Sequence, residues 1–204
     1  MGRPSDARKR LVRAAVTEIF AHSYGSVSVD DLCSKAEVTK SSFYHFFSSK
    51  HDLALASLDA YWQSTQTHVI EPSFATDVAP RERILRFFDL TYEGQRAIWE
   101  TAGQLRGCLV GNMTLEMSAQ DAEFRDKVDS IFTSWIGYFE RAVRDGVEQG
   151  VFKSADPTIT AKALLAYLEG VLLLARSCND PEVIKQLRGG VLSLLHVEED
   201  DKTR

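Results

Sequence analysis

Apolar residues recur at helical spacing along most of the chain. The first such stripe is made of Leu11, Val12, Ala15, Val16, Ile19 and Phe20. Residues spaced in this way, in pairs about one helical turn apart, lie on one face of a helix. No period-two alternation extends beyond a few residues. The pattern therefore predicts an all-α protein.

Side-chain caps divide the first part of the chain into short helices. Ser28, with Asp31 three residues later, is an Asp form of the capping box and predicts a helix over 29–36. Thr39 can cap a second short helix after a turn of about three residues. A turn this short requires the two helices to cross steeply.

The rest of the chain is predicted to form longer helices. Ser48 or Ser49 can cap a helix from Lys50 to about His68, and a proline-flanked loop follows over 71–79. Further helices are expected at about 80–100, 105–117, 121–149, 157–178 and 181–196. The last two start with an Asp-Pro pair, in which the carboxylate can cap the helix and proline suits its first turn.

The predicted domains differ in charge. A small domain over 1–50 carries eight Lys and Arg against five Asp and Glu, a formal charge of +3, whereas the whole chain carries −5. The remaining residues, a larger domain over 51–197 and a charged tail over 198–204, therefore carry −8. This asymmetry predicts that a polyanion such as nucleic acid meets only the basic end, because acidic surface repels it. A chance asymmetry of the solvated surface is the alternative.

Composition excludes several other classes of protein. With 44% apolar residues, 12 Gly and 5 Pro, the chain is neither disordered nor collagen-like. Its longest apolar stretches, such as 171–175, are far shorter than the roughly 20 residues of a membrane span. We therefore expect a cytoplasmic protein with no membrane contact. Cys33, Cys108 and Cys178 are odd in number and far apart, which predicts reduced thiols.

The helix after Thr39 separates two kinds of side chain. At about 100° per residue, three rings fall on one side and four polar side chains on the other: Phe43, Phe46 and Phe47 against Lys40, Ser41, Tyr44 and His45. We expect the rings to dock on the preceding helices and the polar side to suit phosphates and base edges. Ser28, Thr39 and Lys50 would add donors near helix N-termini. A three-helix bundle with a polar outer face is the alternative.

Residues 8–58 resemble a known DNA-binding module. The stretch SVSVDDLCSKAEVTKSSFYHFFSSKHDLALASL is similar to the N-terminal helix-turn-helix of the TetR family of transcriptional regulators in its aromatic spacing, turn and caps. The resemblance implies a homodimer that places two recognition helices in successive major grooves of a palindromic DNA operator. It also implies that Lys40, Ser41 and Tyr44 read or position on the DNA, and that His45 and Lys50 hold phosphates.

The turn inside this module departs from the family pattern. The family usually has Gly in the turn where this chain has Glu37, and a left-handed non-Gly residue costs on the order of 1 kcal/mol. We therefore expect Glu37→Gly to raise stability.

A basic arm of Arg3, Arg8, Lys9 and Arg10 could lie along the DNA backbone or reach a minor groove. A disordered basic tail is the alternative.

The larger domain is rich in rings, which suits a helical ligand-binding domain. Most of the rings must be core, but pockets between helices also bind small apolar ligands. The candidate effector contacts are Phe88, Tyr92, Trp99, Cys108, Asn112, Trp135, Tyr138 and Tyr167. For each ring, plain core packing is the alternative.

The segment LRGCLVGNMTLEMS, residues 105–118, adds thiol chemistry. Gly103, Gly107 and Gly111 recur every four residues and would form a bare strip if they were helical. Cys108 lies beside Arg106 and near a predicted helix start, both of which lower a thiol pKa. The segment resembles a branch of the TetR family that responds to electrophiles and unsaturated carbonyl compounds, which implies that Cys108 can be the sensor. Non-covalent effector binding and an inert buried Cys are the alternatives.

The helices at about 157–178 and 181–196 resemble the dimerisation pair of that family. Their apolar stripes are Leu164, Leu165, Leu168, Val171, Leu172 and Ala175, then Val183, Leu187, Val191, Leu194 and Leu195. Such stripes suit a four-helix interface between two chains. In a monomer the same stripes would be intramolecular core.

Enzyme motifs are missing from the sequence. It has no GxSxG, HExxH or dinucleotide fingerprint, and its five His show no metal spacing, so we expect no catalytic residues, metal or cofactor. A thiol-dependent enzyme, a nonspecific helical DNA-binding protein and a chaperone-like scaffold are the rivals. A regulator should prefer its palindrome over other duplexes by about 10³ or more. We therefore expect a ligand-responsive transcriptional regulator, most often a repressor in this family.

Overall fold

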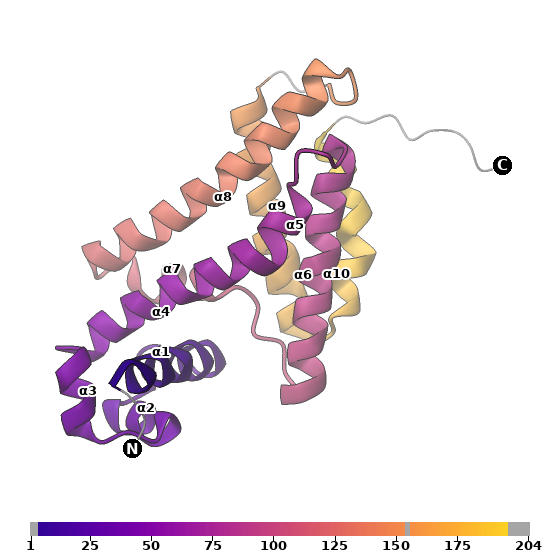
Figure 1. The fold of residues 1–204 in the computed structure, drawn as a ribbon. Helices are drawn as coiled ribbons and strands as arrows, with labels where there is room; N and C mark the ends of the chain where they lie inside the picture. The colour runs from indigo at the N-terminus through magenta and orange to yellow at the C-terminus, as the bar shows by residue number, and fades with distance from the viewer. Residues whose placement is uncertain (1–3, 154–155, 196–204) are drawn as a thin grey trace. The chain divides into compact units, whose positions relative to one another are not determined.

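The computed structural model describes residues 4–153 and 156–195 (Figure 1). Within these ranges the structure contains helices and turns and no strand, which confirms the predicted all-α fold. In chain order the helices are α1 (Pro4–Ala21), α2 (Val29–Ala36), α3 (Lys40–Phe46), α4 (Lys50–Thr65), a π-helical segment (Gln66–Ile70), α5 (Glu71–Ser73), α6 (Pro80–Ala102), α7 (Leu109–Met117), α8 (Ala122–Glu148), α9 (Pro157–Cys178), α10 (Glu182–Leu187), a 3₁₀ turn (Arg188–Gly190) and α11 (Val191–Leu194).

The helices form two compact units that do not follow the order of the chain. The first unit comprises Met1–Thr65 and Cys108–Ile131, and the second comprises Gln66–Gly107 and Phe132–Arg204. α8 contributes its first part to the first unit and the remainder to the second. The first unit is therefore larger than the predicted domain over 1–50, because α4, α7 and the start of α8 pack with α1–α3.

The first unit is built around α1. This helix packs against α4 and α2, and the apolar stripe predicted for it supplies core residues such as Leu11, Ala15 and Ile19. Leu32 of α2 and Phe43 of α3 are buried in the same unit. The short helices are thus held mainly by packing, since helices of seven or eight residues are marginal alone.

The second unit has an aromatic and aliphatic core. α6, α9 and α10 run beside one another (Figure 1), with contacts from α10 to both α6 and α9. By length and composition α9 could also cross a membrane, but core helices of globular proteins pass the same test. Leu164 and Leu168 of α9 are fully buried inside this unit, so α9 is a core helix.

The region after α4 differs from the predicted loop over 71–79. The helical backbone continues beyond His68 through the π-helical segment and α5, so only residues 74–79 connect to α6. Pro72 lies in the first turn of α5, directly after the π-helical segment.

The three glycines do not form a strip on one helix, because the helical condition for it is not met. Gly103 ends α6 in the left-handed conformation with φ 70°, and Gly107 has φ 72°. α7 consequently begins at Leu109 rather than near residue 105. Spacing of four residues suggested a helix, but glycine at a helix end instead provides positive φ at low cost.

The predicted helix over 181–196 is also interrupted. α10 ends at Leu187, and a 3₁₀ turn at Arg188–Gly190 separates it from α11. Two consecutive glycines weaken a helix at this point. His196 and the charged tail over 198–204 lie outside the described residues, as does Arg3 of the predicted arm. For Arg8, Lys9 and Arg10 the prediction of an arm or a disordered tail is wrong, because these residues are part of α1.

Candidate nucleic-acid interface and effector domain

α3 separates polar and aromatic side chains as predicted. Its four polar residues are all exposed: Lys40, Ser41, Tyr44 and His45. Tyr44 is 58% exposed, although its ring meets the ring of Phe43 edge-on at 5.1 Å. Phe43 and Phe47 are buried beneath the helix, and Phe46 is half-buried. α3 therefore presents a polar face of mixed hydrogen-bonding groups to the outside.

Side-chain caps fix where α2 and α3 begin. The Ser28 hydroxyl accepts from the Asp31 N–H at 3.1 Å, and the Asp31 carboxylate accepts from the Ser28 N–H at 2.9 Å. The Ser28 hydroxyl also donates to that carboxylate at 2.6 Å, which lowers the pKa of Asp31. Thr39 accepts from the Ser42 N–H at 3.1 Å. Both predicted caps are confirmed.

The turn between these helices depends on Glu37. Glu37 has φ 52° and ψ 49°, which is the left-handed region. Its N–H bonds to the Ser34 carbonyl, and the Val38 N–H bonds to the Cys33 carbonyl at 3.0 Å, so the turn closes α2 in the manner usual for glycine. The predicted effect of Glu37→Gly requires residue 37 to be left-handed, and the structure meets this requirement.

An ion pair on the polar side was not foreseen from the sequence. The Lys40 ammonium lies 2.8 Å from the Asp30 carboxylate, and both side chains are more than half exposed. The hydrogen bond to Asp30 raises the pKa of Lys40. DNA binding through Lys40 would therefore compete with Asp30. Asp30 and Lys40 belong to different helices, so only the crossing of α2 and α3 brings them together.

Lys50 makes more internal contacts than predicted. Its ammonium donates to the Tyr24 and Val27 carbonyls, each at 2.9 Å, and lies 4.2 Å above the Tyr24 ring. An ammonium has three donors, so a phosphate could take at most the third. Ser49, rather than Ser48, accepts from the Asp52 N–H and caps α4.

The α1–α2 turn is held by residues that sequence reasoning did not select. The Glu116 carboxylate, near the end of α7, accepts from the Tyr24 N–H at 2.9 Å and the Gly25 N–H at 2.7 Å. The Tyr24 ring meets Phe124 of α8 edge-on at 5.3 Å. These partners are about 90 residues apart in the chain, so no local pattern could have identified them.

The start of α8 is fixed in the same unit. Asp121 accepts from the Phe124 N–H at 3.0 Å, and its other carboxylate oxygen lies 3.1 Å from His51 Nε2. The backbone bond from Phe124 is the first cause of a lowered Asp121 pKa, and the neighbouring His51 is a lesser one. His51 also meets the Phe124 ring at 4.9 Å. α4 and α8 are thereby joined beside the α1–α2 turn.

Two candidate effector residues, Cys108 and Asn112, lie in the first unit. Cys108 is 3% exposed and is the N-cap of α7, where its sulfur accepts from the Gly111 N–H at 3.4 Å. The predicted placement of this thiol at a helix start is confirmed. Asn112 lies one turn later and is half-buried.

The other candidate effector residues lie in the second unit. An aromatic cluster there consists of Phe74, Phe87, Phe88, Trp135, Tyr138 and Phe139. Phe87 is central, with ring centres 5.1 Å from Phe139 and 5.9 Å from Trp135. Phe88 extends the cluster to Tyr167 at 6.1 Å. The structure thus brings Phe88, Trp135, Tyr138 and Tyr167 together.

Tyr92 and Trp99 lie farther along α6. The Tyr92 hydroxyl donates to Glu182 of α10, and Trp99 is exposed near the end of the helix. Gln95, between them, was not selected but is buried and donates to the Gly107 carbonyl at 2.8 Å. A buried amide in an otherwise polar stretch has no signature in the sequence.

No group of three or more His, Cys, Asp or Glu that could hold a metal is found in residues 4–153 and 156–195. The His51 ring lies within 4 Å of the carboxylates of Asp52, Asp121 and Glu123, and its shortest contact, 3.1 Å, is to Asp121.

Comparisons with known proteins agree with this architecture. Residues 11–57 match the model for bacterial regulatory proteins of the tetR family, and residues 80–191 match the tetracyclin repressor-like C-terminal domain. The transcriptional regulator AcuR of Cereibacter sphaeroides is 32% identical over 172 residues, covering 83% of this chain and 76% of that protein.

Solved structures give the same result. A regulatory protein TetR from Rhodobacter sphaeroides superposes with a TM-score of 0.81 at 29% identity, covering 91% of this chain and 96% of that one. The reduced form of NemR from Escherichia coli has a TM-score of 0.80 at 23% identity, covering 95% of this chain and 99% of that one. The chain therefore belongs to the TetR family of bacterial transcriptional regulators.

Proposed function

We propose that this protein binds a palindromic operator as a homodimer, represses transcription, and is released by a small-molecule effector. The observation that carries the proposal is α3, whose polar residues are exposed while Phe43 and Phe47 anchor it from behind. NemR, whose fold this chain shares, is named a transcriptional repressor, which supports repression as the direction of control. Such a protein would act in the cytoplasm.

The proposed roles on DNA follow from exposure and chemistry. Lys40, Ser41 and Tyr44 would meet base edges or position the helix, and His45 would hold a phosphate. Lys50 would contribute its remaining donor. Ser28 and Thr39 already serve as helix caps, so they would act near phosphates through the helix starts that they order. Residues 1–50 would thus read DNA and 51–197 would respond to effector.

Dimerisation is proposed through α9 together with the helices at 182–194. The α9 stripe over 164–175 that the sequence offered for this interface is buried in the chain's own core. The proposed contacts are instead Ile159, Leu173 and Leu174 of α9, which are each more than half exposed. Large apolar side chains on the outer side of a helix are typical of an interface. A two-fold dimer would place one α3 in each half of a palindromic operator.

The effector is proposed to act at Cys108. Addition of the thiol to an unsaturated carbonyl compound forms a C–S bond at the β-carbon, while the C=C π pair moves to the α-carbon, which takes up the proton lost from sulfur. The N-cap position of Cys108 supports this chemistry. The burial of Cys108 favours the second candidate, non-covalent effector binding among the neighbouring side chains.

α7 offers a route from Cys108 to the DNA-binding helices. The helix begins after Cys108, and Glu116 near its other end holds the backbone of Tyr24 and Gly25 between α1 and α2. A change at Cys108 that displaces α7 would therefore disturb that turn, and α4 would follow through Lys50. Shifting a two-state equilibrium from 99:1 to 1:99 takes about 5.5 kcal/mol of differential binding, which two effector molecules per dimer could share.

DNA binding is tested first. Duplexes that bind the protein are selected from a random library, and the affinity of the selected palindrome is compared with that of a shuffled duplex at fixed salt. Tyr44→Ala should weaken binding by about tenfold or more, whereas Leu115→Ala, which changes an exposed residue of α7, should not. Equal affinity for both duplexes would indicate a nonspecific DNA-binding protein instead.

The effector chemistry is tested with N-ethylmaleimide, and saturated N-ethylsuccinimide is the matched control. The maleimide should release wild type and Cys178→Ser from the operator and add its mass at Cys108, while Cys108→Ser should stay bound. Release of Cys108→Ser by the succinimide would support the non-covalent candidate, whereas release of this variant by the maleimide alone would point to reaction at Cys33 of α2. Cys178 is exposed, so it also reports whether labelling of a surface thiol has any effect.

A further inference from the structure

The first unit contains a basic hollow that the proposed function does not use. It has a volume of about 280 Å³ and is lined by Arg10, Arg13, Ala14 and Thr17 of α1 and by Lys35, Ala36 and Glu37 at the end of α2. Ala14 and Ala36 are buried and form its floor. Three cations and one carboxylate therefore surround a space with a small apolar base.

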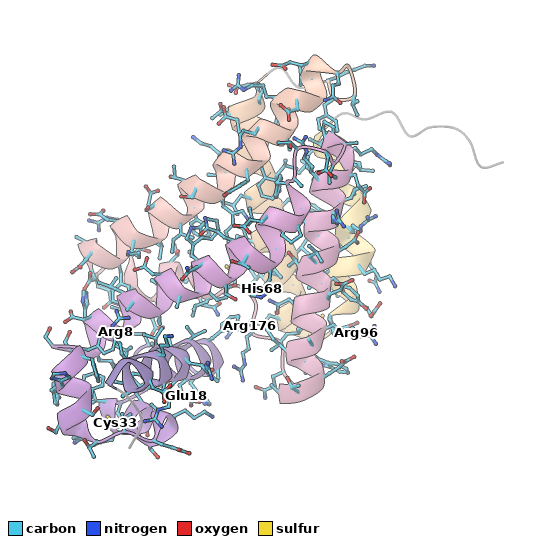
Figure 2. The ribbon with its side chains drawn as sticks, viewed as in Figure 1. Arg8, Glu18, Cys33, His68, Arg96 and Arg176 are labelled. Atoms are coloured by element: carbon cyan, nitrogen blue, oxygen red, sulfur yellow. The ribbon has the colours of Figure 1, made fainter. Side chains whose placement is uncertain are left out.

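The two arginines supply most of the available charge. Lys35 is paired with Glu18 at 3.1 Å on the α1 side, where Figure 2 labels Glu18, so its charge is already partly neutralised. Arg10 is half-buried, and its Nε is fully buried yet has no hydrogen-bond partner among the described residues. Arg13, three residues along the same face, is exposed.

We propose that this hollow binds a phosphate-class anion between Arg10 and Arg13. Guanidinium groups match the oxygens of a phosphate with parallel N–H donors. Arg10 would offer its terminal N–H groups to the anion, because its Nε is closed to the solvent that fills the hollow. The anion is either a phosphate of the DNA backbone or a free phosphorylated or inorganic anion. Glu37, which lines the hollow two residues before the cap of α3, opposes the anion and keeps its affinity low.

The site is tested on the DNA-free protein with inorganic phosphate. The Nε–H signals of the arginines are followed by NMR during a phosphate titration, and a chloride titration at equal ionic strength is the control. The Arg10 signal should shift saturably with phosphate but not with chloride. This measurement needs no operator, so its failure would leave the proposed function untouched. A shift that is linear in phosphate, or equal in chloride, would overturn the proposal.

Matched variants assign the shift to the hollow. Arg13→Gln changes an exposed residue and should weaken phosphate binding by about tenfold without affecting folding. Arg125→Gln, which changes an exposed arginine of α8, should leave binding unchanged. Glu37→Gln removes the opposing charge while keeping a non-Gly residue in the turn, and should strengthen binding several-fold. Wild-type affinity in both Arg13→Gln and Glu37→Gln would contradict the proposed site.

The operator complex then distinguishes the two sources of the anion. If DNA supplies the phosphate, the Arg10 signal will already be shifted in the complex and added phosphate will have no further effect. Arg13→Gln should then also make the plot of log DNA affinity against log salt concentration shallower by about one unit of slope, the loss of one phosphate contact. If the site takes a free anion, phosphate will titrate equally in the complex and the salt dependence will be unchanged.

Discussion

The helix-turn-helix of the first unit and the aromatic cluster of the second are assembled in different ways. Ser28 bonds to a residue three positions away, and so does Thr39, so neighbouring residues set where α2 and α3 begin. Phe87, in contrast, meets Phe139 about 50 residues along the chain. Local signals therefore set where the short helices of the first region begin, whereas the aromatic cluster exists only after distant helices have packed. Substitutions should show the same difference.

The largest effect is expected at the centre of the aromatic cluster. Phe87 is fully buried and meets rings from two other segments, Phe74 after α5 and Trp135 of α8. Phe87→Ala should therefore lower the free energy of unfolding by about 3–5 kcal/mol. Denaturant unfolding followed by circular dichroism would measure it. Trp99→Ala, at an exposed ring of α6 outside the cluster, is the control and should change little. Similar losses for both would mean that the cluster is not the core of this unit.

A smaller effect is expected where α8 approaches a buried ring. Gly146→Ala would place a Cβ atom against the ring of Phe152, which is itself buried, and such overpacking costs about 1–3 kcal/mol. Gly94→Ala is the matched control, because nothing lies within 4 Å of its added Cβ. That variant should gain about 0.5–1 kcal/mol from helix propensity. If the melting temperatures of Gly146→Ala and Gly94→Ala change in the same direction, the ring of Phe152 can move aside at little energetic cost.

The sequence predicted more of the first region than of the second for a physical reason. Caps and the amphipathic pattern are local, so the bounds of α2 and the exposed face of α3 could be predicted from residues such as Ser28 and Tyr44. The hold of Glu116 on the α1–α2 turn could not be, because it depends on tertiary packing. Gly103 was misread because four-residue spacing is compatible both with a helix and with a sequence of turns.

The capping box of α2 should contribute about 1 kcal/mol and should depend on pH. Ser28→Ala removes the acceptor for the Asp31 N–H and the hydroxyl that lowers the pKa of Asp31. A lowered pKa stabilises the fold at pH values above the unfolded-state pKa of about 3.9. This contribution is lost as the pH falls through the folded-state pKa. The stability difference between wild type and variant should therefore narrow below about pH 4. Parallel curves would show that the Ser28–Asp31 bond does not affect folding.

The smallest effects concern two of the left-handed positions, Glu37 and Gly103, and the signs of the two effects should be opposite. Glu37→Gly relieves about 1–2 kcal/mol of left-handed strain but adds about 0.4–1 kcal/mol of unfolded-state entropy, so a net gain of about 0.5 kcal/mol is expected. Gly103→Ala has open space around its Cβ, so the same terms with reversed sign should give a comparable loss. Chemical denaturation of both variants measures the two changes in the free energy of unfolding. A lower midpoint for Glu37→Gly would mean that the Glu37 side chain makes a contact that outweighs the strain, so the comparison separates backbone conformation from side-chain contacts at residue 37.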